Sequence, residues 1–103
     1  MTTLLEHRGD ARFKCQSKVT FENYYSGNYY QAIMYNYSRS GMYFESDYAP
    51  LPGTEIYIGI ENSPYDIGPD FYRAQIRWRR ELSKDLSNHQ FGVGVKYQYP
   101  INP

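Results

Sequence analysis

The sequence predicts an all-β domain of six short antiparallel strands, arranged as a barrel or a sandwich. The first observation is an alternation of apolar and polar residues that recurs from Arg12 onward, because successive side chains of a strand point to opposite faces. The second is a turn signal of glycine, proline, asparagine or serine between consecutive runs, as expected for short antiparallel strands. The third is that no stretch has a convincing amphipathic helix period, which favours a β architecture.

The first half of the chain predicts three strands. In residues 13–21 the odd positions are mostly apolar and the even positions polar, which indicates one buried face. Turn residues at 23–28 separate this run from a second strand at 29–35, and Asn36 closes that strand. A third strand is expected at 42–45, after the turn that ends at Gly41.

The second half predicts three more strands. Pro50-Leu51-Pro52-Gly53 is a strong break before the alternating run 54–60. The next run, 71–80, alternates with Trp78 on its apolar face, so we expect that indole to pack in the core. A polar connection at 81–90, with room for a helical turn, leads to the last strand at 91–97. The glycines of this strand share one face, which is typical of a strongly bent strand or a close backbone approach.

Length and composition limit the classes of protein. The chain has 103 residues, the size of one domain, and 11 basic residues balance 11 acidic ones. Zero net charge argues against a protein that coats DNA, RNA or an anionic membrane, but permits a local basic patch. Cys15 is the only cysteine, so we expect no disulfide, an inert core thiol and a reducing, cytoplasmic setting.

Tyrosine is unusually abundant, with 13 residues. Ordinary packing on half-buried sheet surfaces is the preferred interpretation, and an aromatic-binding surface is the alternative. His7 and His89 lack a partnering cysteine or carboxylate cluster, so we expect no metal. No catalytic set is evident, and the chain is predicted not to be an enzyme.

Two short patterns are the best indication of function. Arg8 and Arg12 are separated by three residues before the first strand, and Asn36-Tyr37-Ser38-Arg39-Ser40-Gly41 forms a turn after the second. Guanidinium groups bind phosphate bidentately and stack on bases, and Asn, Ser and Gly supply an amide, a hydroxyl and a permissive backbone. Each pattern alone is explained by an exposed leader or an ordinary turn. Together they predict a site for a small planar anion.

Both patterns, in this order, resemble the PilZ domain family, whose signature is RxxxR followed by D/NxSxxG. Arg8 and Arg12 match the first part, and the second part is matched by Asn36, Ser38 and Gly41. The resemblance implies a six-stranded β-barrel that binds the bacterial second messenger cyclic di-GMP. It implies one domain over 1–103, with a flexible ligand-clamping leader at 1–11, a barrel at 12–97 and a tail at 98–103.

The resemblance also implies roles for single residues. Arg8 and Arg12 would pair with the phosphates and contact guanine, Asn36 and Ser38 would hydrogen-bond a guanine edge or a phosphate, and Gly41 would allow close approach. The secondary candidates are His7, Arg39 and Trp78, the last as an alternative to core packing. Four arginines are expected on solvated faces, where they would enlarge the positive field: Arg39, Arg77, Arg79 and Arg80.

The sequence therefore predicts a non-catalytic receptor that binds cyclic di-GMP, needs no cofactor and passes the signal to an unidentified downstream protein. Its interaction surface would change when the ligand binds. Two alternatives stay open. One is a PilZ-like protein-interaction module that no longer binds the nucleotide. The other is a single-strand nucleic-acid binder of the OB-barrel type that uses tyrosine stacking.

Overall fold

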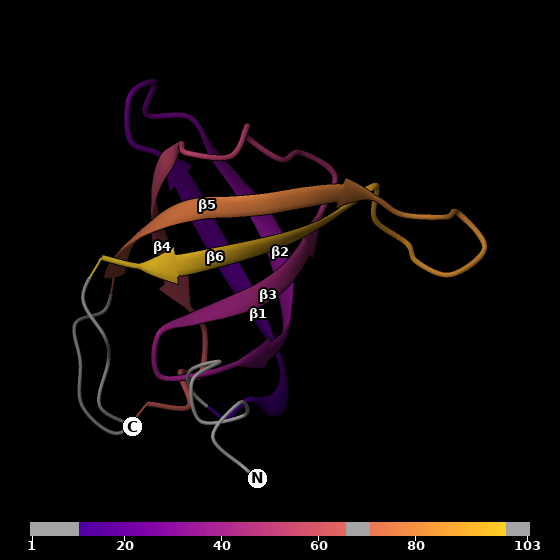
Figure 1. Cartoon of the computed structure of the whole chain (residues 1–103), viewed down its shortest axis with the longest axis horizontal. Coiled ribbons are helices and arrows are strands. Elements are labelled where there is room, and N and C mark those ends of the chain that lie inside the picture. The colour runs from indigo at the N-terminus through magenta and orange to yellow at the C-terminus, as the bar shows by residue number, and fades with distance from the viewer. Residues whose placement is uncertain (1–10, 66–70, 99–103) are drawn as a thin grey trace, which may run out of the picture.

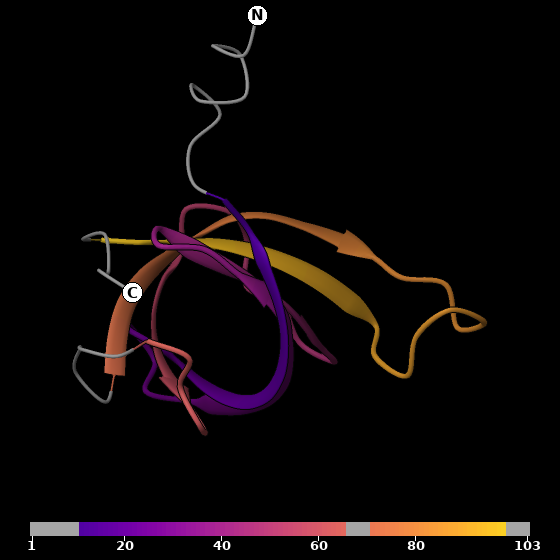
Figure 2. The same cartoon turned by 90° about the horizontal axis from the view of Figure 1, so that it is seen from below.

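A computed structural model describes residues 11–65 and 71–98 of the chain, and it confirms the predicted all-β class. Its elements are β1 (Phe13–Asn23), β2 (Tyr29–Tyr37), β3 (Gly41–Ser46), β4 (Glu55–Ile60), β5 (Phe71–Glu81) and β6 (Phe91–Tyr97). All pairings are antiparallel, and they close a barrel in the order β1-β2-β3-β6-β5-β4. Figure 1 shows the strands crossing one another around the barrel, and Figure 2 shows the ring that they form.

The strands are longer than the alternation predicted at several ends. β2 continues through Asn36 and Tyr37, which the sequence assigned to a turn, and β1 and β5 both span 11 residues. The connection from β5 to β6 forms turns rather than a helix and projects well beyond the barrel wall (Figures 1 and 2). Residues 1–10 of the predicted leader at 1–11, and residues 99–103 of the predicted tail at 98–103, lie outside the described residues.

The core fills the barrel with the side chains that alternation assigned to the inner faces. Phe21 and Phe44 are fully buried, and their rings stack at 5.0 Å between centroids. Cys15 is half-buried against this core. The buried apolar residues are Val19, Phe21, Ala32, Met34, Met42, Phe44, Ala49, Ile56, Ile58, Tyr65, Tyr72, Ala74, Ile76, Val93, Val95 and Tyr97.

A cluster of tyrosines closes one end of the core beneath the β2–β3 turn. The hydroxyl of Tyr65 donates to the carbonyl oxygen of Ser38 at 2.5 Å and lies 2.9 Å from the hydroxyl of Tyr97. Burial raises the pKa of Tyr65 to about 12, against an opposing effect of its hydrogen bond with Tyr97. Burial also raises the pKa of Tyr97, which lies deeper. The buried hydroxyls thus stay protonated and hold the turn to the barrel.

The position of Trp78 differs from the prediction. The expected core packing is wrong, because the Trp78 side chain is on the outer surface and 43% exposed. A β-bulge causes the change: Ile76 faces Val95, but Trp78 faces Gly94, so β5 contains one extra residue against β6. An extra residue reverses the faces of every later side chain on its strand.

Candidate functional site

Two β-bulges at the same level of the barrel turn two side chains outward. In β2, Met34 faces Phe44 while Asn36 faces Tyr43, which leaves one extra residue in β2. Unbroken alternation from Met34 would have pointed Asn36 into the core. The bulge in β5 does the same for Trp78. Bulges are common beside functional sites because they re-aim a side chain.

The register places the outward residues in one continuous row across four strands. Asn36 of β2 faces Tyr43 of β3, Tyr43 faces Gly94 of β6, and Gly94 faces Trp78 of β5. Neighbouring strands lie about 4.8 Å apart, so this row brings together residues that are up to 58 positions apart in the sequence. The row forms the floor of a surface groove.

Two glycines of β6 provide space for the aromatic rings of that floor. A Cβ atom at Gly94 would overlap the indole of Trp78, and one at Gly92 would lie 2.5 Å from the hydroxyl oxygen of Tyr43. The rings therefore lie over the β6 backbone, with their centroids 5.7 Å apart and their planes 25° apart. This explains the predicted close approach at the β6 glycines: the neighbouring groups are side chains.

We call this hollow the β3–β6 groove, and it has a volume of about 480 Å³. It is lined by Arg12, Asn36, Met42, Tyr43, Arg77, Trp78, Arg80, Gly94 and Val95. Three of these residues are arginines, and no described lining residue is acidic. The Arg80 guanidinium lies over the Trp78 ring, 5.6 Å from its centroid. The groove thus combines positive charge with aromatic surface.

Arg12 and Asn36, one from each sequence pattern, are in direct contact. Arg12 Nε donates a hydrogen bond to Asn36 Oδ1 at 2.9 Å. Arg12 precedes β1, and β1 pairs with the end of β2 through Lys14 and Asn36. The strand pairing therefore brings the two patterns to one place. His7 and Arg8 lie outside the described residues.

Ser38 and Gly41 build the corner beside the groove rather than its lining. Ser38 is 1% exposed, its backbone N–H donates to Gly41 O at 2.8 Å, and its hydroxyl accepts from Ser40 N at 3.2 Å. A Cβ at Gly41 would overlap the carbonyl oxygen of Val95. The glycine is thus needed for the contact of β3 with β6. Arg39 lies exposed in the same turn.

A chain of hydrogen bonds leaves the groove toward the β5–β6 connection. Tyr43 donates to Glu45 Oε2 at 2.7 Å, and Ser87 Oγ donates to Glu45 Oε1 at 2.6 Å. Burial, followed by the hydrogen bond with Glu45, raises the pKa of Tyr43. Ser87 Oγ also accepts from the backbone N–H of His89 at 3.0 Å. Glu45 therefore links the groove floor to the projecting connection.

Sequence reasoning missed one contributor to the groove, Tyr43, which was not singled out. It gave three others a minor part: Arg77 and Arg80 were assigned to a solvated face, where they would enlarge the positive field, and Trp78 was assigned to the core, with a ligand contact as the alternative. The two arginines are indeed exposed, but they also line the groove. The signal that could have found the rings is the pair Gly92 and Gly94, because two glycines on one outer face leave room for large neighbouring side chains.

The described residues contain no group of three or more His, Cys, Asp or Glu side chains placed to hold a metal ion. They also form no helix of the length and apolar character that a membrane crossing requires. The site is built from cations, amides and aromatic rings. It is equipped for binding an anion with planar rings.

A closed antiparallel barrel with a cationic, aromatic groove on its wall defines the class of this protein as a small β-barrel domain. The family model for the PilZ domain matches residues 6–103. Because that match covers nearly the whole chain, the protein belongs to the PilZ family. PilZ domains are generally non-catalytic receptors for cyclic di-GMP. A search of curated proteins gives no match.

Proposed function

We propose that this chain is a receptor for cyclic di-GMP and that the ligand binds in the β3–β6 groove. The observation that carries the proposal is the lining of the groove, which joins three arginines to an amide and two stacked rings without a described acidic residue. A cyclic dinucleotide presents the complementary groups: two phosphates, two flat bases and polar base edges. The volume of about 480 Å³ is in the range of small-molecule sites.

Each groove residue has a role that follows from its chemistry. Arg12 pairs with a phosphate, and Arg8 supplies a second guanidinium by the sequence pattern. Asn36 hydrogen-bonds a base edge, because its amide offers a donor and an acceptor. Trp78 and Arg80 form a platform on which a guanine ring stacks. Ser38 and Gly41 support these contacts by shaping the corner, and a direct contact of Ser38 with the ligand stays a prediction.

The receptor acts by changing what a partner protein contacts, and it breaks no bond in the ligand. Occupation of the groove perturbs Tyr43, whose hydroxyl is linked through Glu45 to Ser87 in the β5–β6 connection. That connection projects from the barrel, where a partner protein has access to it (Figure 1). We place this function in the cytoplasm, in keeping with the single, half-buried cysteine.

Isothermal titration calorimetry with cyclic di-GMP tests the proposal. Arg12→Ala is expected to weaken binding by about 2–5 kcal/mol, the usual cost of removing one partner of a desolvated charge pair. Arg73→Ala is a matched control, because Arg73 is an exposed arginine on β5 outside the groove lining. It should leave the affinity unchanged.

Two results would contradict the proposal. Equal affinity of the wild type and the Arg12→Ala variant would exclude the phosphate contact. No binding of cyclic di-GMP by the folded wild type would favour the alternative function, a PilZ barrel that acts only as a protein-interaction module.

A further inference from the structure

The wall of the barrel opposite the groove carries a second row of side chains. In the closed strand order, β1 and β4 lie opposite β3 and β6. Tyr29 of β2 faces Glu22 of β1, Glu22 faces Tyr57 of β4, and Tyr57 faces Arg73 of β5. This row therefore crosses four strands on the outer surface, as the groove row does on the other side.

Aromatic rings extend this row into a continuous surface, which we call the aromatic face. Tyr24 packs against Tyr57 at 5.6 Å and against Tyr25 at 5.1 Å, measured between ring centroids. The Phe71 ring lies over Gly59, where a Cβ would be 2.9 Å from it. The aromatic face consists of Glu22, Tyr24, Tyr25, Tyr29, Glu55, Tyr57, Phe71 and Arg73.

This face is exposed to an unusual degree for such large side chains. Tyr25 is 74% exposed, Tyr29 is 70% exposed and Phe71 is 63% exposed. Contiguous exposed apolar surface on a folded domain marks an interaction site. Tyrosine, phenylalanine and arginine are also the residues enriched in protein interfaces. The aromatic face therefore has the composition of an interface without a partner in the described chain.

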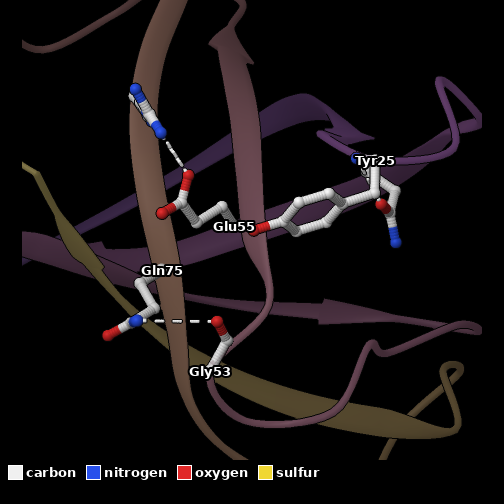
Figure 3. A network of polar contacts seen from close by, with 6 residues as sticks. Tyr25, Gly53, Glu55 and Gln75 are labelled. Carbon is white, nitrogen blue, oxygen red and sulfur yellow. Dashed lines mark hydrogen bonds and ion pairs between the residues drawn. The ribbon is translucent and has the colours of Figure 1, made fainter.

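The charges on this face are of both signs, and one pair is in direct contact. Arg73 Nε donates to Glu55 Oε1 at 3.1 Å, and the Arg73 guanidinium lies 4.9 Å from the centroid of the Tyr24 ring. Figure 3 shows the Glu55 end of this network from close by, with the neighbouring hydrogen bond of Gln75 to Gly53. With Glu22 and Glu55 against Arg73, the face has a formal charge of only −1 and no strong excess of one sign. A highly charged partner, such as a nucleic acid, is therefore disfavoured.

We propose that the aromatic face is the interface of a homodimer, with its twofold axis parallel to the strands and between β1 and β4. This axis places Tyr29 opposite Arg73 of the partner subunit and Glu22 opposite Tyr57 of the partner subunit. The first pair is a cation–π contact and the second a hydroxyl–carboxylate hydrogen bond. An axis along the row would instead place Glu22 against Glu22 of the partner subunit and Arg73 against Arg73 of the partner subunit. The order of residues in the row is thus self-complementary for one axis only, as an isologous interface requires.

The size of the face sets the strength of the dimer. Four strands about 4.8 Å apart and five residues at about 3.4 Å each give a contact roughly 19 Å by 17 Å. This is smaller than the ~800 Å² per partner of a standard stable interface. The dimer is therefore weak and reversible, with a dissociation constant in the micromolar range or above. Both β3–β6 grooves remain open, because they lie on the outer walls of the pair.

Sedimentation equilibrium of the full chain between about 10 µM and 1 mM tests the dimer. The wild type is expected to shift from monomer to dimer across this range. Tyr29→Lys should raise the dissociation constant at least tenfold, because it places a cation opposite Arg73 of the partner subunit. Leu86→Lys is the matched control. Leu86 is an apolar residue that is 88% exposed, and it lies in the β5–β6 connection, away from the aromatic face.

The outcomes separate this proposal from the proposed function. A wild type that stays monomeric at 1 mM, or equal dissociation constants for the two lysine variants, would overturn the dimer. A thermal melt of each variant confirms that it is folded. The test contains no ligand, so the dimer stands or fails whether or not cyclic di-GMP binds in the groove.

Discussion

The β3–β6 groove and the aromatic face lie on opposite walls of the same barrel, and both are rows of side chains across four strands. They differ in where glycine occurs. Gly92 and Gly94 are adjacent outward positions of β6, so Tyr43 and Trp78 lie over the backbone and leave a hollow. The aromatic face has Gly59 under Phe71, while Tyr25 and Tyr29 remain largely exposed. Similar residue types thus line a hollow on one wall and remain largely exposed on the other.

The two walls also differ in charge. The described lining of the groove contains arginines without carboxylates, whereas the aromatic face has Glu22 and Glu55 beside Arg73. A hollow with excess positive charge suits a small anion. An exposed aromatic surface with charges of both signs suits a protein partner. Shape and charge together support the two proposals, in which the walls bind different kinds of partner.

The largest expected effect comes from filling the space under Trp78. Gly94→Val places a branched side chain where the indole lies, so we expect the affinity for cyclic di-GMP to fall at least 100-fold by calorimetry. Gly59→Val, its counterpart under Phe71, should leave that affinity unchanged and weaken the dimer instead. Loss of ligand binding in both variants would show that the two walls are not independent.

A second variant affects the corner of the groove from inside the core. Tyr65→Phe removes hydrogen bonds to Ser38 O and to Tyr97, and leaving buried groups unpaired should cost about 1–3 kcal/mol of unfolding free energy at neutral pH. Chemical denaturation measures this loss. Tyr25→Phe, on the exposed face, is the control and should unfold like the wild type.

The same tyrosine predicts a dependence of stability on alkaline pH. The pKa of Tyr65 is raised to about 12 in the fold, whereas that of an unfolded tyrosine is about 10. The unfolded chain therefore releases this proton first. The corresponding stability is fully present below pH ~10 and is lost as the pH rises to about 12. Tyr65→Phe should lose less stability over this interval, and an equal loss in both proteins would contradict the assignment.

The smallest expected effect concerns the link between groove and projecting connection. Glu45→Gln weakens the hydrogen bonds from Tyr43 and Ser87, at a cost of about 1 kcal/mol in unfolding free energy. The pKa of Tyr43 should move down toward its ordinary value, because the carboxylate helps to raise it. An NMR titration of labelled tyrosine measures this change. An unchanged pKa would show that Glu45 does not control the Tyr43 hydroxyl.

Most of the fold was accessible from the sequence, because burial of one face imposes a period of two on each strand. The resemblance to the PilZ family also paired Arg12 with Asn36, which the structure places in contact. The positions of the two bulges could not be predicted from the alternation of residues. Each adds one residue with no distinctive composition and reverses the faces beyond it, so extrapolation from Ile76 placed Trp78 in the core.

The position of the turn residues was inaccessible for a different reason. Ser38 has the chemistry of a ligand contact, but hydrogen bonds within the turn and from Tyr65 bury it in the corner. The hydroxyl of Ser38 bonds Ser40 within the turn, whereas the carbonyl oxygen of Ser38 accepts from Tyr65, which comes from a distant segment. A local pattern of residues carries no information on that distant contact.

The location of Trp78 has a practical consequence. The sequence has one tryptophan and 13 tyrosines, and Trp78 forms part of the groove floor. Light of a wavelength that mainly indole absorbs therefore excites a side chain of the groove, and none on the other walls of the barrel. A purine that stacks on this ring will quench its emission, so the protein contains its own optical reporter of occupancy, and titrations need no attached dye.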